Sequence, residues 1–401
     1  MAKFGHEIPA ELVQQIIGYL EDDEESLRLV SLVSSKFKDH CQRIIFSKVQ
    51  FQHPWNAPIG PRYSPGKRLL SLLQKSPEIG TYFRDLTIDG GCTDDVEESW
   101  VAQDLDFSAA LKLIPPTSIR RLRISNVWWD DLPGPAKESI STIARSTSLH
   151  TLVICECPVD LLSVCGPSLK HLETYSLTNF RPSGRKPAMV ERDSSFGLET
   201  LTLLSSQYGP PRIEMDYLLN DANRTGISNL KRLRLMFSNM LHYPAVMPLL
   251  EKATSLTSLL VFQSSKPDCK PTLDLAVLPS LQMLSMRGHV MEDHHPITAL
   301  LKLLRTASPS TPLTYIHTYT CCNSRPLYVD PWKPLDEFLA DNHKGQLPKL
   351  SRLHIRLFSY KGDRKAIMDR LEGALPYSKQ AGILEISIDT EVKQYSNYEP
   401  F

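Results

Sequence analysis

One short apolar pattern recurs along most of this chain and restricts its fold more than any other feature. The pattern is apolar-x-x-apolar-x-apolar, and it recurs between residues 83 and 388. Its last three positions alternate with the period of a β-strand, while the first belongs to the turn before the strand. Clear copies begin at Phe83, Ile119, Leu149, Leu198, Leu230, Leu256, Leu281, Leu350 and Ile383, and weaker ones at Leu169 and Leu313, where Thr174 and Thr318 take the third place.

The segments between these copies have helical patterns. They lie at residues 137–146, 215–221, 244–253, 297–306, 334–343 and 365–375. Stacked strand–loop–helix units form a parallel inner sheet with outer helices, so we expect an α/β solenoid over residues 81–390. The pattern resembles the leucine-rich repeat. Most copies lack the Asn that this motif places after the third apolar residue, and Asn126 and Asn239 come late, so we expect an irregular solenoid.

A closed α/β domain is the alternative fold. Closed parallel sheets bury both faces and need nearly continuous apolar strands. Here the positions between the apolar residues are polar, for example Arg121, Arg123, Arg232 and Arg234. We therefore expect one face of the sheet to be open to solvent, and we favour the solenoid.

The first fifty or so residues have a helical pattern instead. Pro9 and Glu11 suit the first turn of a helix, where proline needs no N–H partner and a carboxylate is favoured by the helix dipole. The apolar residues that follow share one helix face: Leu12, Val13, Ile16, Ile17 and Leu20. The acidic run 21–25 then separates this helix from a second one opened by Glu24, Glu25 or Ser26. The second helix carries Leu29, Val30, Leu32, Val33 and Phe37, and a third is expected over residues 38–46.

This segment resembles the F-box. The family opens Leu-Pro-x-Glu, and here the residues are Ile8-Pro9-Ala10-Glu11; Tyr19-Leu20, a Leu-rich helix ending in Phe37, and Ile45-Phe46 match the later elements. The resemblance implies binding to a Skp-type adaptor and, through it, to the cullin and RING subunits of a ubiquitin ligase. The residues it marks for adaptor binding are Ile8, Pro9, Glu11, Leu12, Ile16, Ile17, Leu20, Leu29, Val30, Val33 and Phe37. How these divide between inner packing and the adaptor surface stays open. The alternative is a helical cap that only covers the end of the repeats.

The expected organisation has four parts. Residues 1–52 form the F-box, and residues 53–80 form a linker rich in Pro and Gly with one short helix at 67–75. The repeats follow over 81–390, and 391–401 form a tail. The order of F-box, Pro-rich stretch, short helix and first strand is similar to that of fungal F-box proteins.

Composition excludes several functions. Lys plus Arg and Asp plus Glu both number 45, so the net charge of zero argues against nucleic-acid binding. No apolar run reaches the roughly 18 residues that a membrane span needs, and no secretory signal is present, so we expect a cytoplasmic or nuclear protein. The cysteines are scattered, which favours small buried hydrophobes over a zinc site at Cys155, Cys157 and Cys165.

The sequence predicts no catalytic centre and no cofactor. It contains no P-loop, nucleophile elbow or His-Glu-x-x-His motif. The cluster of His289, Glu292, Asp293, His294 and His295 is interpreted as a solvated loop rather than a metal site. We therefore expect a non-enzymatic protein.

The repeats offer candidate contacts to a target protein. Arg and Trp are favoured interface residues, and arginines on one open sheet face suit an acidic or phosphorylated segment. The candidates are Arg121, Arg123, Trp128, Arg232, Arg234 and Arg356. Arginines that only keep the sheet soluble are an equal alternative, and Trp128 could pack on a helix. Together these features predict a substrate receptor of an SCF-type ligase, with a repeat scaffold independent of ubiquitin ligation as the alternative.

Overall fold

A computed structural model provides the structure of this protein. It describes residues 9–52, 64–91, 100–127, 129–155, 157, 160–175, 197–205, 212–220, 225–237, 245–263, 273–289, 295–322, 329–342, 345–359 and 363–389. These residues divide into two compact units, one ending at Leu169 and one beginning at Lys170.

The first unit begins with a helical head, residues 9–47. Its helices are α1 (Ala10–Gly18), α2 (Glu24–Val33) and α3 (Ser35–Ile45). Asp23 caps α2 by accepting a hydrogen bond from the Ser26 backbone N–H at 3.0 Å, which places the start of α2 where the acidic run predicts it. The third helix begins at Ser35, three residues before its predicted start, because Ser34 is already extended and ends α2.

A parallel sheet follows the head in the first unit. Its strands pair in chain order: β1 (Lys48–Gln52), β2 (Asp85–Asp89), β3 (Arg121–Ser125) and β4 (Thr151–Cys155). The expected F-box segment, residues 1–52, includes β1, but β1 pairs along its full length with β2, so the sheet begins at Lys48. The head and the sheet are therefore joined by continuous chain, with α3 leading directly into β1.

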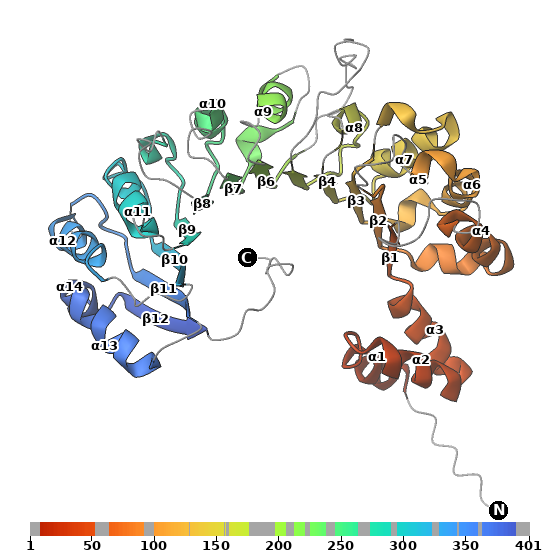
Figure 1. The fold of residues 1–401 in the computed structure, drawn as a ribbon, viewed down its shortest axis with the longest axis horizontal. Coiled ribbons are helices and arrows are strands. Elements are labelled where there is room, and N and C mark those ends of the chain that lie inside the picture. The colour runs from red at the N-terminus through yellow and green to blue at the C-terminus, as the bar shows by residue number, and fades with distance from the viewer. Residues whose placement is uncertain are drawn as a thin grey trace, which may run out of the picture. The chain divides into compact units, whose positions relative to one another are not determined.

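Helices cover one side of this sheet (Figure 1). They are α4 (Pro65–Lys75), α5 (Trp100–Gln103), α6 (Leu105–Lys112), α7 (Gly134–Arg145) and α8 (Asp160–Ser163), with 3-10 turns η1 (Pro77–Tyr82), η2 (Pro116–Ser118) and η3 (Trp129–Asp131). The sequence assigned α4 to a linker, but Leu69 and Leu73 are buried. A Cβ on Gly66 would overlap the backbone of Phe107 in α6, so α4 packs closely as part of this unit.

The second unit contains a longer parallel sheet. Its strands again pair in chain order: β5 (His171–Tyr175), β6 (Thr200–Ser205), β7 (Arg232–Phe237), β8 (Ser258–Gln263), β9 (Met283–His289), β10 (Tyr315–Cys322), β11 (Arg352–Ser359) and β12 (Leu384–Asp389). The strand expected of each repeat copy is thus present. In the last copy, however, Leu384 rather than Ile386 pairs with Leu353, so its predicted register is off by two residues.

The helices of the second unit lie on the outer side of its curved sheet (Figure 1). They are α9 (Arg212–Leu219), α10 (Met247–Lys252), α11 (Pro296–Leu304), α12 (Trp332–Asn342), α13 (Arg364–Ala374) and α14 (Pro376–Gln380), with 3-10 turns η5 (Ile227–Asn229) and η7 (Leu275–Val277). Each predicted helical segment overlaps one of the helices α7 and α9–α13, with ends that differ by up to three residues. The chain is therefore α/β, with parallel strands and helices on one side in each unit.

Stacking of equivalent residues holds each sheet together. The first apolar position of each copy is buried, as at Leu149, Leu230 and Leu313. At the start of most strands, the residue before the strand and the first residue of the strand both donate their backbone N–H groups to a single carbonyl in the preceding copy, as Lys231 and Arg232 do to Glu199. Because these contacts repeat with little change, the apolar pattern fixes the register.

His295 departs from the sequence interpretation. The cluster containing it was predicted to be a solvated loop, but His295 is buried and accepts a hydrogen bond at Nδ1 from the Ile297 N–H, capping α11. Its ring also meets Trp332 edge-on, with centroids 5.5 Å apart. Burial lowers the pKa of His295 to about 4, because the charged ring would lose its hydration. Residues 290–294 lie outside the described part.

We expect acid to destabilise the second unit through His295. Its pKa is lower in the folded chain than in the unfolded one, so its contribution is complete above pH 6.5 and is lost as the pH falls toward 4. This difference in pKa corresponds to a loss of about 3 kcal/mol in the free energy of unfolding once His295 must be protonated. Urea unfolding from pH 4 to 7 should therefore show a smaller pH slope for His295→Asn, which keeps a capping acceptor. The exposed His150 provides the control: His150→Asn should keep the wild-type slope, and an unchanged slope in His295→Asn would contradict the assignment.

Candidate functional site

The head has a small core of its own. Val13 and Ile17 from α1, Leu27 from α2 and Cys41 from α3 are buried together. Further side chains pack partly against this core: Leu20, Val30, Phe37, Ile44 and Ile45. One face of each helix therefore contributes to the core of the head.

The head also exposes large apolar side chains. The exposed fractions are 48% for Leu12, 47% for Ile16, 91% for Tyr19, 62% for Leu29, 82% for Leu32 and 74% for Val33. In the described residues only Leu105, Leu113 and Met368 add to this class outside the head. Exposed apolar surface concentrated in one small segment is typical of a site that binds another protein.

The structure separates the residues that the F-box resemblance marks for adaptor binding. Exposed positions are Pro9, Glu11, Leu12, Ile16, Leu29 and Val33, while Leu20, Val30 and Phe37 pack partly inward. Ile17 is 1% exposed, so the expectation of a direct contact through Ile17 is corrected to a role in the core. Ile8 lies outside the described residues. Sequence reasoning left out Tyr19 and Leu32, although the apolar residues on a second face of α2 were a signal for Leu32.

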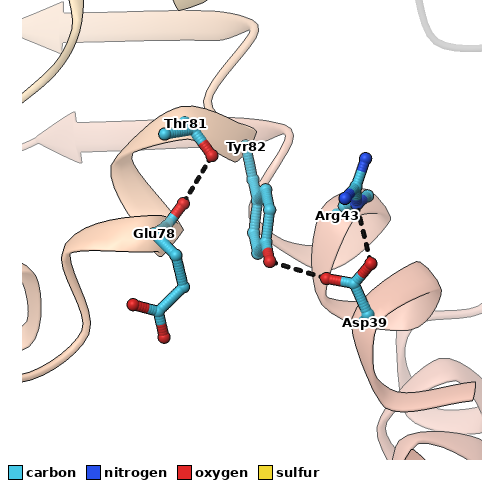
Figure 2. Close-up of polar contacts among 5 residues, drawn as sticks. All are labelled: Asp39, Arg43, Glu78, Thr81 and Tyr82. Carbon is cyan, nitrogen blue, oxygen red and sulfur yellow. Dashed lines mark hydrogen bonds and ion pairs between the residues drawn. The ribbon is translucent and has the colours of Figure 1, made fainter. Parts of the chain in front are cut away.

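A polar joint links the head to the first unit's repeats (Figure 2). The Tyr82 hydroxyl of η1 donates to Asp39 Oδ1 at 2.7 Å, and Arg43 Nε lies 3.0 Å from Asp39 Oδ2. The Arg43 guanidinium also lies over the Tyr82 ring, 5.4 Å from its centroid. The Tyr82 hydrogen bond lowers the pKa of Asp39 and raises that of Tyr82. Together with the α3–β1 connection, these contacts hold the head against η1.

Removing the Tyr82 hydroxyl should loosen this joint. We expect Tyr82→Phe to raise the pKa of Asp39 toward its usual value, because the hydroxyl is the largest cause of the lowering. Its cost in stability should be small, about 1 kcal/mol, since the pair is largely solvated. A carboxyl NMR titration measures the pKa, and hydrogen exchange reports on α3. Thr81→Val removes a neighbouring hydroxyl that bonds Glu78 instead, so it should leave Asp39 unchanged.

In the first unit the predicted arginines stand on the open face of β3. Arg121 and Arg123 are exposed, and Arg123 lies in register with Thr87 and Val153 on the neighbouring strands. Neither guanidinium has an ion-pair partner within the described ranges. Trp128 lies outside the described residues, so its predicted contact stays a prediction. Both arginines are available for a partner.

In the second unit the predicted arginines do not form one row. Arg232 and Arg234 stand on β7 and Arg356 on β11, all on the open face. Followed strand by strand across the sheet, Arg234 is in register with His354 of β11. Arg356 is in register with Met236 of β7 instead. Arg356 is ion-paired with Asp389 at 2.6 Å. These three arginines therefore share the open face of the sheet but stand in different rows of it.

The open face of β10–β12 instead carries a ring cluster that sequence reasoning missed. The rings of His317 and His354 stack with centroids 4.9 Å apart. The Tyr315 hydroxyl lies 3.0 Å from His354 Nδ1, and His354 Nε2 lies 2.9 Å from the Ser387 hydroxyl. Burial lowers the pKa of His317 to about 4, so this ring is neutral at neutral pH. The alternation of residues along each strand puts these side chains on one face of the sheet. Only the pairing of the strands brings them next to one another.

Neither a metal centre nor a membrane-spanning helix is present in the described residues. No group of three or more His, Cys, Asp or Glu side chains there could hold a metal ion. The thiols of Cys41, Cys157, Cys165 and Cys321 are buried, and Cys155 is half-buried. No described helix is both long and apolar enough to cross a membrane.

Comparison with known proteins adds no family assignment. No protein-family model matches the chain, and no curated protein sequence matches it. The exposed surfaces of the protein are therefore the best guide to its function.

Proposed function

We propose that this chain is the substrate receptor of an SCF-type ubiquitin ligase. In this proposal the head is an F-box that binds a Skp-type adaptor, and through it the cullin and RING subunits. The repeats are an irregular leucine-rich-repeat solenoid whose open face binds the target. The receptor contributes proximity and orientation, while ubiquitin transfer uses chemical groups of other subunits.

The observation that carries the proposal is the exposed apolar surface of the head. A cap needs one apolar face for its own core, which Val13, Ile17 and Leu27 already provide. Leu12, Ile16 and Leu29 are exposed in addition, and leaving such side chains in water is unfavourable unless a partner covers them. Their positions coincide with the F-box-like pattern, which supports the adaptor as that partner.

Co-expression with a Skp-type adaptor tests the proposal. The full chain should elute with the adaptor as one complex in size-exclusion chromatography, at one copy of each. Separate elution of two folded proteins would contradict the F-box assignment and favour a repeat scaffold that works without the ligase.

A further inference from the structure

One row of side chains on the open face of the second unit's sheet changes from apolar to cationic along its length. In register across β7–β11, this row reads Met236, Phe262, Arg287, Tyr319 and Arg356. All five side chains are half-buried. The row is apolar over β7 and β8 and cationic over β9–β11. The described helices α9–α12 lie on the other side of the sheet, so they do not cover it (Figure 1).

Tyr319 lies between two guanidinium groups. The Arg287 guanidinium carbon is 4.8 Å and that of Arg356 5.7 Å from the centroid of the Tyr319 ring. Cations stacked on an aromatic ring are held in place without losing their hydrogen-bond donors. This stacking fixes the two arginines before any partner arrives, which lowers the entropy cost of binding.

The charges on this part of the face do not cancel. Arg352 is paired with Glu385, and Arg356 with Asp389. Arg287 has no ion-pair partner among the described residues. One uncompensated guanidinium suits one singly charged carboxylate better than a phosphate dianion, which usually needs several free cations.

We propose that this row binds an extended acidic peptide of a target protein. An Asp or Glu side chain of the peptide pairs with Arg287, and an apolar side chain packs on Met236 and Phe262. Neighbouring strands are about 4.8 Å apart and an extended chain rises about 3.3 Å per residue, so roughly two or three residues separate the two anchors. This inference deepens the proposed function, on which it rests for the role of the peptide as a ubiquitination target.

Selection from a phage library of random 12-residue peptides, with the full chain immobilised, tests the inference. The enriched peptides should carry Asp or Glu about two or three residues from a large apolar residue. Arg287→Glu should instead enrich Lys or Arg at the same spacing, a gain that a folding defect cannot produce. Enrichment without an acidic residue, or with the same residues in both proteins, would overturn the proposal.

An enriched peptide, made synthetically with a fluorophore, then gives the affinities by polarisation. Arg287→Gln should weaken binding roughly 10- to 100-fold, the loss expected for a charge-assisted hydrogen bond. Arg305→Gln removes an exposed arginine beside α11 and should bind like the wild type. Phosphoserine in place of the acidic residue should not bind more tightly, and a tenfold gain would assign the site to phosphate and overturn the carboxylate.

Two further measurements distinguish peptide binding at this row from self-association of the chain and from adaptor binding by the head. Sedimentation of the full chain should show no self-association that Arg287→Gln removes; such an effect would assign the row to a second copy and overturn the proposal. Adaptor co-purification should be unchanged in Arg287→Gln. Loss of peptide binding with intact adaptor binding locates the defect in the repeats, whereas failed adaptor binding by the wild type would refute only the F-box assignment.

Discussion

Replacing Ile16 and Leu29 together by aspartate should abolish co-purification of this chain with a Skp-type adaptor. The exposed fractions of the two side chains are 47% and 62%, so the folded head loses few internal contacts, and its stability should fall by about 1 kcal/mol. At an interface, each lost apolar contact costs about 1–3 kcal/mol, and the buried carboxylates add a desolvation cost. We expect at least a roughly 100-fold loss of affinity.

A matched pair of polar substitutions serves as the control. Gln14→Asp and Lys38→Asp also add negative charge at exposed head positions, on α1 and α3, without removing apolar surface. This variant should still co-elute with the adaptor, and circular dichroism should show native helix content for both variants. Equal binding by the Ile16/Leu29 variant and the wild type would refute the assignment of this surface.

Asp336→Ala should be among the most destabilising single substitutions in the second unit. Asp336 of α12 is buried and caps α14: its Oδ2 accepts from the Tyr377 N–H at 2.8 Å. Its Oδ1 accepts from the Ser378 N–H at 2.9 Å and from the Ser378 hydroxyl at 2.6 Å. Removing the carboxylate leaves three donors without an acceptor, and we expect a loss of about 3–5 kcal/mol.

Two comparisons isolate this cap. Ser378→Ala removes only the hydroxyl donor and should cost about 1 kcal/mol, while Glu337→Ala, at the exposed neighbouring position, should have little effect. Urea unfolding gives the free energies, and hydrogen exchange should show α14 opening first. A loss below 1 kcal/mol in Asp336→Ala would mean that the cap contributes little.

The repeat pattern predicted most of the fold, because a period of two with a fixed apolar set leaves one register that buries every copy. It failed where the local pattern was ambiguous. The last copy offers apolar residues at Ile383, Leu384, Ile386 and Ile388, and only pairing with β11 selects Leu384 for the middle position. Similarly, β1 looked like the end of the head, because a short strand has no local signal for its partner.

For the candidate sites, sequence by itself determined which residue types are present and which positions lie on one helix or strand face. The tertiary structure decided which of those faces are covered. Ile16 and Ile17 are equivalent in the sequence pattern, yet the packing of α1 against α2 and α3 buries one and exposes the other. The sequence pattern gave no reason to select Arg287 as a binding residue. Its position is set by Tyr319 and Arg356, which are distant in the chain and adjacent only through strand register. Sequence periodicity predicts the helix or strand to which a residue belongs and the face on which it lies. Its burial and its charge pairing depend on the residues that the fold brings beside it.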